Sequence, residues 1–185
     1  MGSYQGERGG TQCNPAEPGY YVDSHFASSQ TACLAGTYNP STGSTSSNDC
    51  MDAAPGFFVE NVGSASQQAC ELGYYQPNSG WLSCLMADPG NYVDTLAATA
   101  QITCEAGTYN PNSGSTTAFA CLDAEPGNYV PDPASASQIP CEEGSYQNQR
   151  QQTECKPASL GYFVNTTGIA DSIASRLLHR HGRFH

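Results

Sequence analysis

The chain has 185 residues and a formal net charge of −11, with six Lys and Arg residues in total. This balance argues against binding of nucleic acid phosphates or anionic lipids, and no apolar run is long enough to span a membrane. Leu, Ile, Val and Phe are so scarce that a chain of this composition without crosslinks would be disordered, yet nine cysteines are present.

The cysteines mark an internal repeat. Residues 13–83 overlay on residues 84–154 without a gap and with 34 identities in 71 positions. Within this repeat, a pattern of Cys or Ala, two residues, Gly, one residue and Tyr or Phe recurs every 17 or 20 residues. Its first residue, here called the anchor, alternates between Ala and Cys: Ala16, Cys33, Ala53, Cys70, Ala87, Cys104, Ala124, Cys141 and Ala158. The sequence therefore predicts a truncated repeat over residues 1–15 and nine repeats over residues 16–174.

Each repeat is predicted to contain two short β-strands. Segments of the type Gly-x-Tyr-Val, at residues 19–22 and 127–130, favour β structure, and the Asp, Asn, Pro, Gly and Ser clusters that follow cannot continue a helix. Repeats this small cannot bury a core alone, so we expect them to stack on their neighbours. The predicted fold class is a small disulfide-rich all-β repeat protein, an elongated solenoid or rod of stacked 17–20-residue β-hairpins.

Two disulfide registers are compatible with the spacing. We favour one that clamps each Cys-anchored hairpin, pairing Cys33 with Cys50, Cys70 with Cys84, Cys104 with Cys121 and Cys141 with Cys155, and leaving Cys13 unpaired or intermolecular. The other register pairs Cys13 with Cys33, Cys50 with Cys70, Cys84 with Cys104 and Cys121 with Cys141, and leaves Cys155. Zinc ligands are usually paired two to four residues apart, unlike these cysteines, so we expect disulfides and an extracellular or cell-surface location.

The Ala-anchored repeats have a substitute for the clamp. Where the Cys-anchored repeats have two cysteines, these repeats have Ala and usually Gln: Ala16 with Gln30, Ala53 with Gln67, Ala87 with Gln101, and Ala124 with Gln138. The pattern predicts that the crosslink is replaced in these repeats and not moved elsewhere.

The runs Cys104-Glu-Ala-Gly-Thr-Tyr and Ala124-Glu-Pro-Gly-Asn-Tyr-Val resemble the ephrin-receptor-like cysteine-rich repeat. The clamped Gly-x-Tyr hairpin is also similar to the first module of tumour necrosis factor receptor domains. The resemblance covers roughly residues 1–174, although Cys-x-x-Ala stands here where family members usually have Cys-x-x-Cys. It implies an extracellular, non-catalytic protein of the kind found in stalks, receptor ectodomains and microbial surface proteins.

Catalytic and metal-binding patterns are weak. His25 is the only histidine before residue 179, and Leu96 stands in its place in the matching repeat, so we expect no enzyme activity and no cofactor. Acidic residues do recur, and stacking would align them into ladders that could bind calcium. We favour a solvated acidic face instead. The residues concerned are Glu17, Asp88 and Glu125 after the anchors, and Asp23, Glu60 and Asp94 further along.

The sequence also contains candidate glycosylation sites and an unusual carboxy-terminal segment. Residues 41–47 and 113–117 are rich in Ser and Thr and predict exposed loops, either O-glycosylated or simply solvated. Asn165 begins the one N-glycosylation sequon. Residues 175–185 form a basic, His-rich tail in which Ser175 stands where the next anchor cysteine would fall. For this tail we favour a docking or unrelated segment over a metal site.

Two functions are compatible with these features. We favour a structural protein whose partner is a second copy of itself, joined head to tail into a surface filament, because an Ala-anchored repeat over residues 158–174 should be followed by a Cys-anchored one, and residues 1–15 are of that type. The alternative is a ligand-binding or adhesive ectodomain or stalk. For a binding site, the residues that deviate most from the repeat are the candidates: Trp81, His25 and Phe26.

Overall fold

The computed structural model describes residues 1–174 and is all-β with almost no helix. Two compact parts are distinguished. The amino-terminal part comprises Met1–Asp88, Tyr92–Ile102 and Gly114–Thr117, and the carboxy-terminal part comprises Pro89–Asn91, Thr103–Ser113 and the residues from Ala118 on. The repeat pattern did not predict this division.

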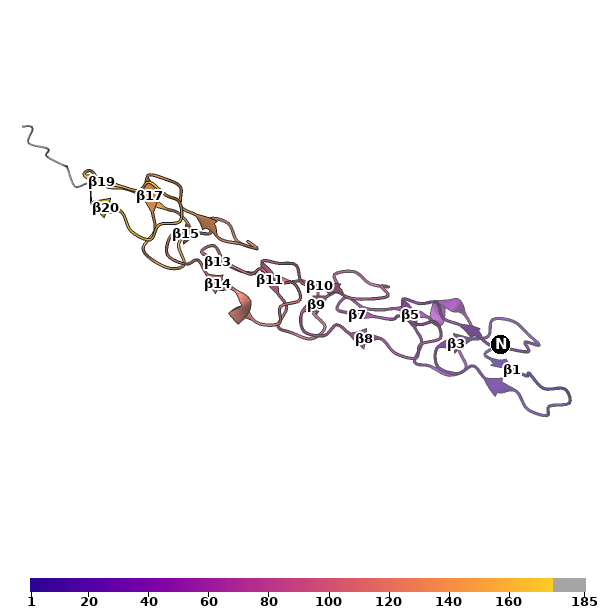
Figure 1. The fold of residues 1–185 in the computed structure, drawn as a ribbon. Coiled ribbons are helices and arrows are strands. Elements are labelled where there is room, and N and C mark those ends of the chain that lie inside the picture. Colours follow the sequence, from indigo (N-terminus) through magenta and orange to yellow (C-terminus); the bar gives the residue numbers. More distant parts are fainter. Residues whose placement is uncertain (175–185) are drawn as a thin grey trace, which may run out of the picture. The chain divides into compact units, whose positions relative to one another are not determined.

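The amino-terminal part contains five antiparallel hairpins that follow one another in chain order (Figure 1). Their strands are two residues long because a turn follows each Gly-x-Tyr segment. They are β1 (Ser3–Tyr4) with β2 (Asn14–Pro15), β3 (Tyr20–Tyr21) with β4 (Thr31–Ala32), β5 (Thr37–Tyr38) with β6 (Met51–Asp52), β7 (Phe57–Phe58) with β8 (Gln68–Ala69), and β9 (Tyr74–Tyr75) with β10 (Leu85–Met86). A 3₁₀ helix, η1 (Ser47–Asp49), fills the longer loop of the Cys33 repeat.

The carboxy-terminal part contains four hairpins of the same kind. They are β13 (Thr108–Tyr109) with β14 (Leu122–Asp123), β15 (Asn128–Tyr129) with β16 (Ile139–Pro140), β17 (Ser145–Tyr146) with β18 (Lys156–Pro157), and β19 (Tyr162–Phe163) with β20 (Ile173–Ala174). A second 3₁₀ helix, η2 (Ala118–Ala120), occupies the longer loop of the Cys104 repeat. Strands β11 (Asn91–Tyr92) and β12 (Ile102–Thr103) lie where the chain passes between the two parts. The prediction of a disulfide-rich all-β hairpin repeat is confirmed, whereas the elongated rod stays a prediction.

Two residues of each repeat supply most of the buried interior. We number every repeat from its anchor as position 1, so that the glycine is at position 4 and the aromatic at position 6. The anchors are buried in all but the Ala158 repeat, and position 7 is buried in every anchored repeat. Position 7 is Val in the Ala-anchored repeats (Val22, Val59, Val93, Val130, Val164) and an amide in the Cys-anchored repeats (Asn39, Gln76, Asn110, Gln147).

A set of three backbone hydrogen bonds joins each anchored repeat to the next, up to the Ala158 repeat, and we call it the backbone lock. The N–H of position 4 donates to the carbonyl of position 7 in the next repeat, and the N–H of position 7 donates to the carbonyl of position 12 there. In return, the N–H of position 11 in the next repeat donates to the anchor carbonyl. Between the Ala16 and Cys33 repeats the pairs are Gly19 to Asn39 at 2.7 Å, Val22 to Ser44 at 2.9 Å, and Gly43 to Ala16 at 2.7 Å.

The position 4 glycines also pack against the second repeat further on. A Cβ on Gly19 would lie 2.0 Å from the carbonyl oxygen of Gly63, and one on Gly107 would lie 2.6 Å from that of Gln151. Both glycines have a φ near the left-handed region, at 88° and 87°. Conformation and space therefore both require glycine at this position.

Candidate functional site

The four disulfides have the register favoured from the sequence. Each clamps one Cys-anchored hairpin with a Cα–Cα distance of 5.6 to 5.8 Å. Cys13 is free and exposed. Structural disulfides persist in oxidising compartments, so the protein is of the secreted or extracellular kind.

The Ala-anchored repeats have the predicted substitute clamp, and it is a hydrogen bond. Gln30 accepts through Oε1 from the N–H of Glu17 at 2.8 Å, and its amide donates to the Glu17 carboxylate at 3.1 Å. Gln101 makes the same pair of contacts with Asp88. The equivalent amides Gln67 and Gln138 accept from the backbone N–H of Ala54 and Glu125.

The buried amides at position 7 of the Cys-anchored repeats were not predicted. In the 17-residue repeats, Gln76 donates to the carbonyl of Ser83 and Gln147 donates to that of Glu154. In the 20-residue repeats the shorter Asn39 and Asn110 reach back to the carbonyls of Tyr20 and Asn91 in the preceding repeat. These amides support the loops that contain positions 11 and 12, whose backbone groups take part in the backbone lock. Their signal in the sequence is the strict alternation of Val with Asn or Gln at one fixed position.

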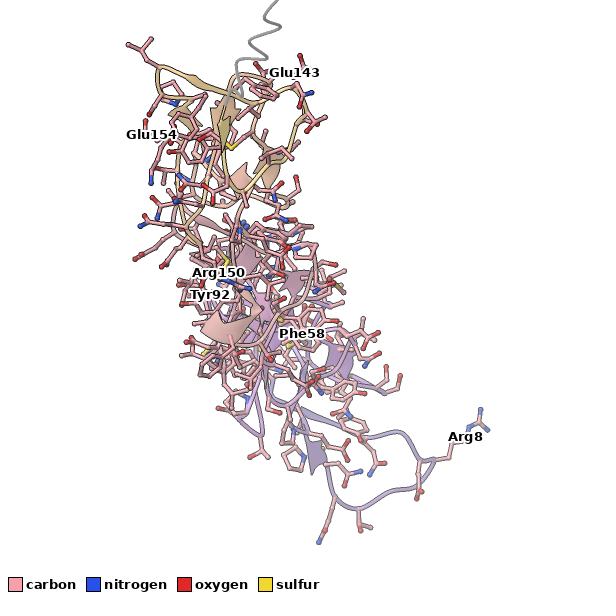
Figure 2. The ribbon with its side chains drawn as sticks, turned by 60° about the vertical axis from the view of Figure 1, so that its left-hand side comes forward. Arg8, Phe58, Tyr92, Glu143, Arg150 and Glu154 are labelled. Carbon is pink, nitrogen blue, oxygen red and sulfur yellow. A yellow bond between two sulfur atoms is a disulfide. The ribbon has the colours of Figure 1, made fainter. Side chains whose placement is uncertain are left out.

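The acidic residues do not form a metal cluster in residues 1–174, where no three His, Cys, Asp or Glu side chains gather around a possible ion position. The position 8 carboxylates of Asp23, Glu60 and Asp94 are exposed. Elsewhere, Glu143 and Glu154 project outward from the carboxy-terminal part (Figure 2). The His-rich tail, 175–185, lies outside the described residues.

The candidate modification sites are mostly accessible. Asn165 and Thr167 are both exposed in the loop between β19 and β20. Position 8, which Asn165 occupies, is exposed in every anchored repeat, including those with another repeat locked onto them. The hydroxyl-rich segments are exposed except at Ser44, which is buried and contacts the Asn39 amide at 2.7 Å, and at a few half-buried positions. The expectation of a fully exposed loop over residues 41–47 is therefore wrong at Ser44.

The residues that deviate from the repeat differ in whether their backbone conformation is strained. Trp81 stands at position 12 and is half exposed, and its carbonyl accepts the ordinary lock bond from Val59. Phe26 stands at position 11, where φ is positive in every repeat, and it has a φ of 58° with a completely exposed side chain. A bulky residue is strained there, since glycine is the residue that adopts this conformation without cost. The His25 ring lies beside it, with ring centroids 6.4 Å apart.

The Ala158 repeat presents half of a backbone lock without a partner in the described residues. The N–H groups of Gly161 and Val164 donate to no described carbonyl, and the Ala158 carbonyl accepts from none. Gly144 and Gly161 are exposed, and a Cβ on either would meet nothing within 4 Å. We call this surface the donor face.

The truncated repeat presents the other half. Its positions 7 and 12 are Gln5 and Gly10, whose carbonyls accept no hydrogen bond in the described residues, and its position 11 is Gly9, whose N–H donates to none. A hollow of about 370 Å³ adjoins this surface and is lined by Tyr4, Cys13, His25 and Phe26 among others. We call this surface the acceptor face. Arg8 projects from the loop between β1 and β2 (Figure 2).

Within residues 1–174, no helix has the length and apolar character needed to cross a membrane. Neither a family model nor a curated protein sequence aligns significantly with this chain.

Proposed function

We propose that the protein is a non-enzymatic extracellular structural protein whose repeats continue from one copy to the next, forming a surface filament. The complementarity of the donor and acceptor faces carries this proposal. Gly161 and Val164 of one copy would donate to Gln5 and Gly10 of the next, and Gly9 of the next would donate to Ala158. These are the three bonds that join consecutive repeats inside the chain.

The difference in repeat length does not oppose this junction. The lock uses positions 1 to 12, and the 17- and 20-residue repeats differ only after position 12. Accordingly, Ala16 locks onto a long repeat and Ala53 onto a short one with equivalent bonds. The short truncated repeat can therefore follow the Ala158 repeat. Such a contact between two different faces does not close on itself, so it makes a filament.

Repetition itself supports a structural role. The buried amides at position 7 bond backbone carbonyls, and they make equivalent contacts in repeats of the same length. The clamped hairpins support the proposed likeness to ephrin-receptor-like repeats, and with it a non-catalytic extracellular role. A glycan on Asn165 would not block assembly, because position 8 stays exposed when the next repeat is locked in place.

The test is the size of the full chain as a function of concentration, measured by light scattering and by negative-stain electron microscopy. We expect filaments that lengthen with concentration, and loss of assembly when residues 1–12 are deleted, because the acceptor face is then absent. The control is Phe119→Ser, which alters an exposed residue of η2 outside both faces and should assemble as the unaltered chain does. A chain that stays monomeric at high concentration, or a polymer that survives the deletion, would rule the filament out.

An adhesive ectodomain or stalk remains the second candidate, favoured by two shallow apolar hollows beside disulfides. One, of about 240 Å³, lies between Tyr21 and the Cys33–Cys50 bridge. The other, of about 280 Å³, lies between Phe58 and Cys84. A monomeric chain that binds cell-surface glycans through these hollows would favour this function over the filament.

A further inference from the structure

Two large apolar residues break the repeat pattern, one in the first anchored repeat and one in the last. In the other Ala-anchored repeats position 3 is proline (Pro18, Pro55, Pro89, Pro126), but in the Ala158 repeat it is Leu160. In the other Ala-anchored repeats position 11 is small (Gly63, Ala97, Ala134, Gly168), but in the Ala16 repeat it is Phe26. Both deviant side chains are completely exposed.

The contacts inside the chain show which residues these two positions meet. Position 4 of one repeat packs against position 11 of the second repeat further on, as Gly56 does against Ala97 and Gly90 against Ala134. A longer side chain at position 11 lies over that glycine, since Cγ of Gln151 would lie 3.2 Å from a Cβ on Gly107. Position 3 directly precedes this glycine. The position 3 side chain therefore starts one residue from the contact between positions 4 and 11.

The same geometry applies across the proposed junction. In a filament, the Ala158 repeat of one copy is followed by the truncated repeat of the next copy and then by its Ala16 repeat. The Ala16 repeat is therefore the second repeat after the Ala158 repeat. Gly161, now exposed, would then lie beneath position 11 of that neighbour, which is Phe26. Leu160 would flank the same contact.

We infer that Phe26 is the docking residue of this protein for a second copy of itself, and that it seats against Leu160 and Gly161 of that copy. This inference rests on the proposed filament. It explains why a strained, fully exposed aromatic stands where the other Ala-anchored repeats have Gly or Ala: burial against Leu160 compensates for the strain only in the assembled state. It also explains why the two deviations occur at complementary positions.

The experiment compares assembly and folding in variants that restore the repeat pattern. Phe26→Gly and Leu160→Pro should each raise the concentration at which filaments form by about tenfold or more, because each removes a large apolar contact. Phe26→Gly should also leave the thermal stability of the monomer unchanged or higher, because it relieves the positive φ. The matched control is Phe119→Ser, which removes an equally exposed phenylalanine from η2 and should leave assembly unchanged.

The outcomes separate this inference from the proposed function. Failure of the unaltered chain to assemble would overturn the filament and this contact together. Filaments that form at the same concentration in Phe26→Gly and Leu160→Pro as in the unaltered chain would overturn the contact and leave the filament in place. A loss of assembly in Phe119→Ser equal to that in Phe26→Gly would show a general need for exposed apolar surface and would also overturn the specific contact.

Discussion

Reducing the four disulfides is expected to unfold the protein, whereas a metal chelator is expected to leave its circular dichroism spectrum unchanged. Each bridge closes a loop of 14 or 17 residues, and a loop of about 15 residues contributes roughly 3 kcal/mol in the chain-entropy model. Four such terms are comparable with the whole stability of an ordinary domain, about 5–15 kcal/mol. The buried apolar side chains at positions 1 and 7 are too small to replace them, since they are Ala with Val in the Ala-anchored repeats and Cys alone in the Cys-anchored repeats.

The control for this experiment is Cys13→Ser. Cys13 is free and exposed, so its loss should not change the unfolding curve before or after reduction. Removal of one clamp with Cys70→Ser and Cys84→Ser should by contrast lower the unfolding midpoint. A collapse on chelation comparable with that on reduction would contradict the account and would favour calcium binding by the acidic ladders.

Gly107→Val is expected to disrupt the carboxy-terminal part, because two costs add at this position. A side chain at a φ of 87° is strained by about 1–2 kcal/mol, and the new Cβ would lie 2.6 Å from the carbonyl oxygen of Gln151. Overpacking of this kind costs about 1–3 kcal/mol more. Hydrogen exchange should show lost protection in the Cys104 and Cys141 repeats, with distant repeats still protected.

Gly144→Val is the matched variant. Its φ of 84° gives the same strain, yet nothing lies within 4 Å of the added Cβ. In dilute solution Gly144→Val should therefore lower the free energy of unfolding only by the backbone strain. The difference in free energy of unfolding between the two variants then measures the contact of the glycine with the second repeat further on. Equal losses, or cooperative loss of every repeat in Gly107→Val, would contradict packing between alternate repeats.

The spacing of cysteines was compatible with two disulfide registers, and the expected hairpin favoured the one that the structure has. Disulfide partners must lie close in space, and a hairpin brings together the residues that bracket its turn, so the pairing of Cys33 with Cys50 was preferred. The presence of Gln where Cys would stand, as at Gln30, predicted that the crosslink is replaced, and the structure adds that a hydrogen bond replaces it. Both features are local, since partner residues lie within one repeat.

Contacts between repeats were harder to predict. Asn39 and Gln76 resemble ordinary turn residues by composition, and only burial shows that they support the loops. The positive φ at position 11 could not be predicted from the residue type, because Phe26, Ala97 and Gln151 occupy this position as well as glycine. The packing of alternate repeats depends on how far the chain rises between hairpins, which no residue pattern specifies.

Photo-crosslinking from position 26 tests the central claim, that the repeats continue from one copy to the next, most directly. The full chain would carry benzoylphenylalanine in place of Phe26, mixed with an isotope-labelled copy, and crosslinked peptides would be identified by mass spectrometry. We predict crosslinks from residue 26 of one copy to residues 158–164 of another. Crosslinks confined to a single copy, or directed to other segments where filaments are present, would contradict the claim.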